Sequence, residues 1–349
     1  MPNADLTRSV WDVTPAAFPE DGSIGAQAEF CLRYAILAPS SHNSQPWTFT
    51  VEGPEVAVGV DDSRWLEVAD EDRRELFLSV GCALENLLIA AEHFGLDPTL
   101  DYRDGAVDDS EDADGPQVAT VWLDGDAGDG ADPDDHPPAP DDAFEAITDR
   151  RTSHEPFEDR GIPPETLEGI EAAGDVGGVE THRVEEDDPK RAIGELQYAA
   201  DERQMADPEY RRELGRWIGS GALGDSWLKA RIGQLAVTHL DLGEREGEKN
   251  STLVSEAPVL ELLATPEDDR IARIEAGRAF ERMSLSAAAE GVAVHPISQI
   301  LEVPDLKADL ADVVDIEPAT IQHLFRLGYA RSEGGHTPRW PVEEVLESR

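Results

Sequence analysis

Hydrophobic positions recur along this chain in two rhythms, one typical of helices and one typical of strands. Apolar residues spaced three or four apart predict helices at 26–38, 73–94, 144–149, 165–173 and 271–290. Alternating or short apolar runs predict strands at 47–51, 55–60, 118–123, 179–184, 259–264 and 322–329. Residues 189–242 are predicted to be mostly helical, with glycines at several positions. The pattern favours an α+β fold.

The two parts of the chain follow one order: helix, loop, strand, long helix, strand. The long helices stop at Gly95 and Gly291, and glycine is the usual residue just past a helix end. The shared order predicts an internal duplication, although two α+β segments can also look alike by chance. We predict an N-terminal half at 24–125, an acidic linker at 126–140 and a C-terminal half at 141–349. The C-terminal half carries a helical insertion at about 197–250.

The 349 residues are enough to bury a large core without disulfide or metal staples. The two cysteines, Cys31 and Cys82, sit in apolar helical patterns and form no CxxC, so we expect reduced, buried thiols in a cytoplasmic protein. We expect no membrane span, because no apolar run approaches about 18–20 residues. Residues 1–20 lack the pattern of a signal peptide.

The net charge of −46 comes from 29 basic and 75 acidic side chains, and only four of the basic ones are lysines. Such a field repels phosphate backbones and anionic lipids, which argues against nucleic-acid and membrane partners. A carboxylate-rich, lysine-poor surface resembles that of proteins from halophiles, where salt screens the repulsion. The charge therefore says little about the substrate. The nine histidines show no ligand spacing, so no metal site is predicted.

The polar loop 38–47, which reads APSSHNSQPW, is the first candidate for chemistry. It places Ser40, Ser41, Asn43 and Gln45 between a predicted helix end and a strand. Hydroxyl and amide groups of this kind can hydrogen-bond the edge of a flat heteroaromatic ring. The alternative is a turn held together by its own side chains.

The string LAPSSHNSQPWTF resembles the APSxxNxQPW signature of the nitroreductase family, and its histidine form resembles the Acg-like branch. ITDRRTSHEPF resembles the family's RRS/T motif, and the resemblance extends over about residues 25–100 and 141–347. It implies a nitroreductase-like α+β fold, an FMN cofactor and NAD(P)H as electron donor. A small electron-poor acceptor, such as a nitroaromatic compound or a quinone, would be the substrate.

The resemblance assigns roles to several residues. Pro39, Ser40, Ser41, Asn43 and Gln45 would address the flavin ring and ribityl chain. Arg150, Arg151, Thr152 and Arg339 would hold the phosphate, because guanidinium groups pair with phosphate oxygens. An ion-pair cluster with nearby carboxylates is the alternative for the two adjacent arginines. Pro296 and Ile297 would lie near the ring, and His295 is either a proton donor or, as we favour, an ordinary hydrogen-bonded histidine.

Each half keeps a motif that the other lacks. The N-terminal half has the loop but no RRS/T motif, whereas the C-terminal half has Arg150–Thr152 but reads EAAGDVGGVE at 171–180, where a loop would fall. We therefore predict a fused pseudo-dimer with one complete FMN site, existing as a monomer or as a homodimer. By resemblance the 197–250 insertion is a lid, and a helical buttress is the alternative. Two other interpretations compete with the oxidoreductase: a protein that sequesters FMN with little turnover, and a degenerate, flavin-free structural or regulatory protein.

Overall fold

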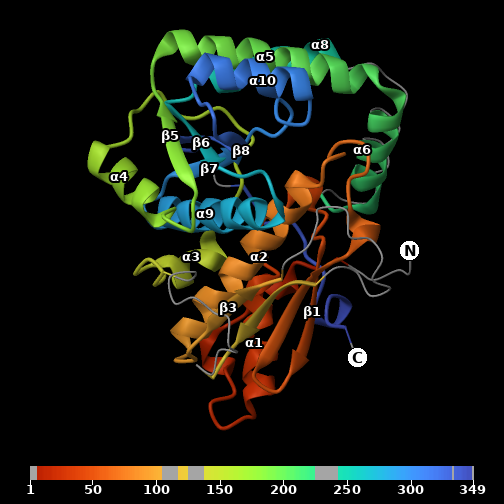
Figure 1. The fold of residues 1–349 in the computed structure, drawn as a ribbon, viewed down its shortest axis with the longest axis vertical. Helices are drawn as coiled ribbons and strands as arrows, with labels where there is room; N and C mark the ends of the chain where they lie inside the picture. The colour runs from red at the N-terminus through yellow and green to blue at the C-terminus, as the bar shows by residue number, and fades with distance from the viewer. Residues whose placement is uncertain (1–5, 104–116, 125–136, 225–242, 332–333, 348–349) are drawn as a thin grey trace.

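The computed structural model describes residues 6–103, 117–124, 137–224, 243–331 and 334–347, with only the backbone of 243–246. Most of the predicted acidic linker lies outside the described residues, as does the stretch 225–242 of the insertion. The described chain has mixed α and β content, with two antiparallel sheets stacked above and below a pair of central helices (Figure 1). The predicted α+β class is therefore confirmed.

The N-terminal part builds the first sheet. Helix α1 (Ile24–Ala35) leads into β1 (Trp47–Glu52) and β2 (Glu55–Val60), and helix α2 (Arg74–His93) precedes β3 (Thr99–Tyr102) and β4 (Gln117–Trp122). The strand order is β1-β2-β4-β3, and all three pairings are antiparallel. Buried valines at 56, 58 and 60 fill the inner face of β2. Strand β3 was not predicted, because a four-residue strand is too short to show a clear alternation.

The C-terminal part builds the second sheet. After α3 (Ala143–Asp149) and α4 (Pro164–Ala173), the strands are β5 (Glu180–Val184), β6 (Val259–Thr265), β7 (Ala293–Pro296) and β8 (Thr320–Gly328). Helix α9 (Arg270–Ala289) lies between β6 and β7. The strand order β5-β6-β8-β7 repeats that of the first sheet, with a long helix between the second and third strands of each. Strand β7 and helix α10 (Pro304–Val314) were not predicted from the sequence.

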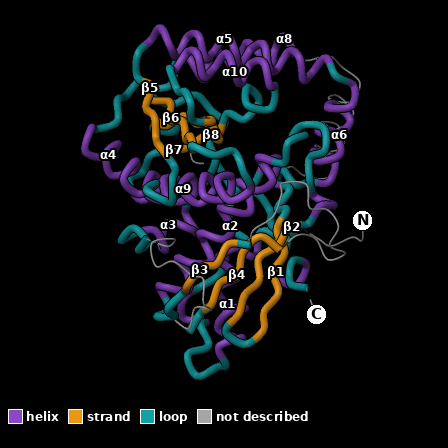
Figure 2. Tube along the Cα trace, viewed as in Figure 1, coloured by secondary structure: helices purple, strands orange, loops and turns teal. Residues whose placement is uncertain are grey.

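The insertion forms helices α5 (Asp187–Ala206), α6 (Pro208–Ser220) and α8 (Gly243–Ser255). Helices α5, α8 and α10 form a layer over the second sheet, opposite α9, and α6 descends towards the first half (Figures 1 and 2). Glu213 of α6 is buried and accepts a hydrogen bond of 2.9 Å from the backbone N–H of Ala69. The insertion is thus anchored on both halves of the chain.

Helices α2 and α9 pack against each other with their backbones in contact. A Cβ atom on Gly81 would lie 2.1 Å from the carbonyl oxygen of Ile274, and one on Gly277 would lie 2.0 Å from that of Leu78. Both helices have 20 residues, and both glycines stand seven residues after the first one (81 − 74 and 277 − 270). The contact between the two helices therefore falls at the same position along each of them.

Among the described residues, helix α2 is the one helix that is long and apolar enough to cross a membrane by length and composition alone. Its apolar window is 89% buried inside the protein. The helix lies between the first sheet and α9, so its hydrophobicity is explained by packing on several sides.

Candidate functional site

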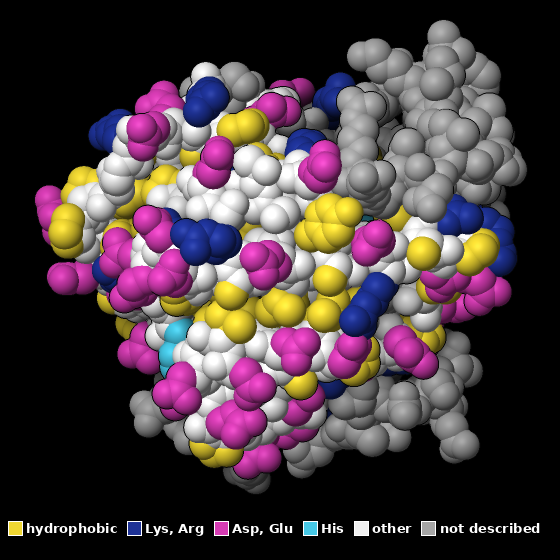
Figure 3. Space-filling model, turned by 90° about the horizontal axis from the view of Figure 1, so that it is seen from above, with side chains coloured by type: hydrophobic (Ala, Val, Ile, Leu, Met, Phe, Trp, Pro, Cys, Tyr) yellow, Lys and Arg dark blue, Asp and Glu magenta, His cyan; other side chains and the backbone are white. Residues whose placement is uncertain are grey.

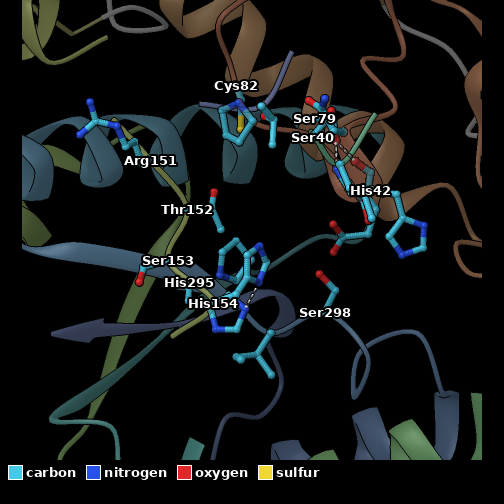
Figure 4. Close-up of a pocket in the computed structure, with 18 of the residues that line it drawn as sticks. Ser40, His42, Ser79, Cys82, Arg151, Thr152, Ser153, His154, His295 and Ser298 are labelled. Atoms are coloured by element: carbon cyan, nitrogen blue, oxygen red, sulfur yellow. Dashed lines mark hydrogen bonds between the residues drawn. The ribbon is translucent and has the colours of Figure 1, made fainter. Parts of the chain in front are cut away.

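A cavity of about 720 Å³ lies where the two halves and the insertion meet. Ligand pockets typically measure about 300–1,000 Å³. Pro39, Ser40, Ser41 and Asn43 of the N-terminal loop line it, together with Ser79 and Cys82 of α2. The C-terminal half contributes the predicted residues Arg150, Arg151, Thr152, His295, Pro296, Ile297 and Arg339. The structure thus brings together predicted site residues that are up to 300 positions apart in the sequence (339 − 39) (Figure 4).

The loop 40–46 holds its shape through its own polar groups. His42, Asn43 and Gln45 all have positive φ angles, of 48°, 53° and 54°. Such conformations cost roughly 1–3 kcal/mol each for residues other than glycine and persist only where the surroundings impose them. Ser40 Oγ accepts from the backbone N–H of Gln45 at 2.9 Å. This strain is typical of a segment shaped for binding.

The side-chain amides of Asn43 and Gln45 bind neighbouring segments of the chain, and of the two residues Asn43 also lines the cavity. Asn43 Nδ2 donates to the carbonyl oxygens of Ala222 and Pro338, at 2.7 and 2.8 Å. Gln45 is fully buried and does not line the cavity; its Oε1 accepts from the backbone N–H of Trp340 at 2.8 Å. The structure therefore does not bring Gln45 to the cavity wall, and its contacts are those of a residue that joins loop and tail.

One end of the cavity is strongly cationic. Arg150 and Arg339 are 5% and 3% exposed, and one guanidinium nitrogen of each donates to the carbonyl oxygen of Leu37 at 3.2 Å. The charge that faces them is Glu281 of α9, 3.4 Å from Arg150. The alternative for the two adjacent arginines was an ion-pair cluster with carboxylates nearby in the sequence; the ion-pair partner of Arg150 among the described residues is instead Glu281. This one carboxylate does not balance two buried arginines.

His336 and Trp11 complete this end, and neither was predicted. Their rings stack with centroids 4.0 Å apart, and Trp11 Nε1 donates to the carbonyl oxygen of Thr337 at 2.9 Å. The Arg339 guanidinium lies over the Trp11 ring at 5.1 Å. Trp11 belongs to an N-terminal segment without a periodic pattern, so only a three-dimensional contact could reveal it.

Burial and neighbouring positive charges shift the pKa values of two groups at this end of the cavity. Burial, followed by the nearby charge of Arg150, lowers the pKa of Arg339 to about 9. Burial and the arginines at 151, 150 and 339 lower the pKa of His336 to about 4. The Nε atom of Arg339 and the Nε2 atom of His336 are buried without a hydrogen bond, and Arg150 Nε lies 3.4 Å from the Glu281 carboxylate, beyond a good hydrogen bond. Unsatisfied buried donors with excess positive charge fit a phosphate group.

A second polar group lies away from Arg151, around His154 and His295 (Figure 4). Thr152 bridges to Val294 of β7, so residues 152–154 run beside the edge of the second sheet. His154 Nδ1 lies 2.8 Å from His295 Nε2, and Arg326 Nε donates to His295 Nδ1 at 2.8 Å. Burial lowers the pKa of both histidines. His295 is thus enclosed in a hydrogen-bonded chain, and His154 is the member that faces the cavity most openly.

The insertion forms part of the cavity wall. Gln197 of α5, Tyr210 and Leu214 of α6, and Lys249 and Asn250 of α8 all line it. Tyr210 also packs with Leu66, Ala69 and Met205 in a small apolar cluster. Both predicted roles of the insertion, cover and buttress, are compatible with these contacts.

No family model matches the chain. The chain is, however, similar over nearly its whole length to oxidoreductase relatives in Mycobacterium tuberculosis. One, named "Putative NAD(P)H nitroreductase", is 27% identical over 365 residues that cover 99% of this chain and 100% of the relative. Another with the same class of name, acg, is 24% identical, with 91% and 94% covered. These relatives support the nitroreductase family, including the Acg-like branch.

Solved structures also align with this chain. The FMN-dependent nitroreductase NfnB from Mycobacterium smegmatis, in complex with NADPH, aligns with a TM-score of 0.42 and 19% identity. The alignment covers 59% of this chain and 98% of NfnB. Iodotyrosine deiodinase bound to FMN and 3-iodo-L-tyrosine gives a TM-score of 0.41 at 15% identity. The assignment to a class of protein rests on the sequence relatives, not on these alignments.

Proposed function

We propose that this protein is an FMN-dependent oxidoreductase of the nitroreductase family that uses NAD(P)H to reduce small electron-poor acceptors such as nitroaromatic compounds or quinones. The observation that carries the proposal is the single cavity in which the N-terminal loop, Arg150–Thr152, residues 295–297 and Arg339 meet. Its cationic end suits the phosphate of FMN, and the loop suits the ring and ribityl chain.

Within this proposal, each group of residues has a physical task. Arg150, Arg151, Thr152 and Arg339 hold the phosphate, and Ser40 and Ser41 offer hydroxyl groups further along the cavity. FMN, when bound, supplies hydride chemistry that the side chains of this chain lack. The insertion limits the access of water and of the acceptor.

The proposal includes a fused pseudo-dimer in which one of two equivalent sites can hold FMN and the space of the other is taken by side chains. The matching strand orders and the corresponding glycines of α2 and α9 support a duplication. Cys82 and Arg278 stand at the same position of their helices (82 − 74 and 278 − 270). Cys82 is small and lines the cavity, whereas the Arg278 side chain donates to Glu85 and to the Tyr102 hydroxyl at 2.8 and 2.6 Å. Arg278 would therefore occupy the space of a second site.

A protein that binds FMN and turns over little is the second candidate. The contribution of Tyr210, Leu214 and Leu223 to the cavity wall favours it, because it makes the insertion part of the enclosure of the site. Both candidates use the same cofactor-binding residues.

Stopped-flow spectroscopy separates the two. The FMN-loaded protein is mixed with NADH or with NADPH under anaerobic conditions, and the flavin absorbance is followed. The proposed oxidoreductase requires that at least one donor bleaches the flavin within seconds and that a nitroaromatic compound or a quinone restores it. Flavin that both donors leave oxidised would contradict turnover and favour sequestration.

A further inference from the structure

The hydrogen-bonded chain from Arg326 to His154 fixes the protonation of both histidines. An arginine Nε–H can only donate, so His295 Nδ1 must accept from Arg326 at 2.8 Å. Neutral His295 then carries its proton on Nε2, which donates to His154 Nδ1 at 2.8 Å. Neutral His154 in turn carries its proton on Nε2. The hydrogen-bonded chain therefore ends at the Nε2–H donor of His154, a residue that lines the cavity.

Contacts of Arg326 and of the backbone at Ser153 hold this hydrogen-bonded chain in place. Arg326 is 1% exposed, lies over the Phe157 ring at 4.1 Å, and donates to the carbonyl oxygens of Ser153 and Glu155 at 3.2 and 2.8 Å. The backbone N–H of Ser153 donates to the carbonyl oxygen of Val294 at 3.0 Å. These contacts fix the segment that bears His154, so the donor is preorganised before a ligand arrives.

Lys249 of α8 supplies a positive charge to the same part of the cavity. It is one of only four lysines in a chain with a net charge of −46. Lys249 is exposed and lines the cavity, and among the described residues no ion pair joins it to a carboxylate. Lys249, His154 and His295 line the same cavity, and the charge of the lysine, after burial, helps to lower the pKa of both histidines. The carboxylate of Glu155 raises the pKa of His154, but by less than the charges of Lys249 and Arg326 lower it.

We propose that Lys249 and His154 form a subsite for an anionic oxygen group, such as a carboxylate or a phosphate, carried by a substrate of the flavin reaction. This inference rests on the proposed function and adds a substrate class to it. The subsite is separate from the arginine cluster at the other end of the cavity, which would hold the FMN phosphate. Two substrates could carry the anionic group: the electron acceptor, or the nicotinamide dinucleotide through its additional phosphate.

Two matched ligand pairs identify the source. In the first pair, 4-nitrobenzoate and 4-nitrobenzamide differ in charge but hardly in shape. In the second pair, NADPH carries one phosphate more than NADH. Equilibrium binding of all four is measured by calorimetry at one KCl concentration, with and without bound FMN, and KM and kcat are measured with the FMN-loaded protein.

The wild-type protein should bind the more anionic member of at least one pair about tenfold more tightly, as expected for one charge-assisted hydrogen bond. Lys249→Gln should abolish this preference, and Lys249→Arg should retain it. His154→Phe should weaken both members of the pair. Arg191→Gln is the matched control, because it removes one positive charge from an exposed position on α5 outside the cavity.

Equal binding within both pairs, or a preference that survives Lys249→Gln, would overturn the subsite. Failure of the flavin reaction is a separate result, since flavin content and reduction by NAD(P)H are measured independently. If FMN does not bind, the calorimetry of the flavin-free protein still shows whether the lysine selects anionic ligands.

Discussion

At the scale of single residues, buried charge is the feature that defines this cavity. Arg150 and Arg339 donate to the same carbonyl oxygen, and Glu281 is the carboxylate that pairs with Arg150 among the described residues. Burial raises the pKa of Glu281 to about 7, so this carboxyl can lose its charge near neutral pH. An uncompensated buried charge is costly, and an incoming phosphate would relieve that cost.

Arg339→Gln should therefore weaken FMN binding. A hydrogen bond to a charged group contributes about 1.5–3 kcal/mol, so we expect at least a tenfold rise in the dissociation constant of FMN, measured by the quenching of flavin fluorescence. Arg191→Gln, which changes the net charge by the same amount on an exposed surface, should leave FMN binding unchanged. Equal affinities for wild type and Arg339→Gln would remove Arg339 from the phosphate site.

Glu302 predicts a pH dependence of stability. Burial, followed by the charge of Glu75, raises the pKa of this carboxyl from 4.5 to about 8. A carboxyl with a raised pKa in the folded state favours folding most below its unfolded pKa, and this contribution is lost as the pH rises towards 8. Glu302→Gln cannot ionise, so the variant should gain stability relative to wild type between pH 5 and pH 9, by on the order of 1 kcal/mol or more.

Urea unfolding in molar KCl at pH 5, 7 and 9 measures this difference. Glu168→Gln, on the exposed face of α4, is the control and should show no comparable trend. A gap between wild type and Glu302→Gln that stays constant with pH would show that Glu302 ionises as readily in the folded protein as in the unfolded chain.

At the scale of elements, the contact between α2 and α9 holds the two halves together. Because both glycines touch a backbone carbonyl of the other helix, a side chain at either position must push the helices apart. Gly81→Val should lower the free energy of unfolding by about 3 kcal/mol or more, as large disruptions of a packed core do. Thermal unfolding followed by circular dichroism measures the loss.

The control for this prediction is Gly169→Ala on α4, where nothing lies within 4 Å of the added methyl group. Alanine is the better helix former by about 1 kcal/mol, so this variant should match or exceed wild-type stability. A Gly81→Val protein as stable as wild type would mean that the helices do not pack as described.

Elements with a strong pattern could be predicted from the sequence, and short ones could not. The apolar stripe of residues 73–94 predicts α2 to within one residue, and the predicted strands at 47–51, 55–60 and 259–264 are confirmed within about one residue. The strand β7 has four residues, too few for alternation to be visible. Helix α10 starts at Pro304, and the sequence reading did not detect its apolar face, which buries Leu306 and Leu310.

The residues of the candidate site likewise fall into those that a sequence motif identifies and those that only the fold brings to the cavity. Ser40, Ser41 and Arg150–Thr152 stand in contiguous motifs, so a sequence pattern can identify them. Trp11 and Lys249 reach the cavity only through tertiary contacts, from two separate segments. His154 follows Thr152 by two residues, but its partner His295 is visible only in three dimensions. Gln45 shows the converse, since its place in a motif did not reveal that its side chain binds the C-terminal tail.

At the scale of the whole molecule, the surface charge dominates. Asp and Glu side chains spread across the face seen from above, interrupted by smaller groups of Lys and Arg (Figure 3). A net charge of −46 repels itself in the folded state, and salt screens that repulsion. We predict that the melting temperature rises steeply between 0.1 and several molar KCl, measured by differential scanning fluorimetry. A melting temperature independent of KCl would contradict this reading of the composition.

The central claim is that two related halves build one complete FMN site in one chain. The most direct test is the amount of FMN bound per chain, measured by absorbance and mass spectrometry on protein purified and reconstituted with excess FMN in molar KCl. The account predicts one FMN per chain. Two per chain would show that Arg278 does not fill a second site, and none would contradict the flavin site itself.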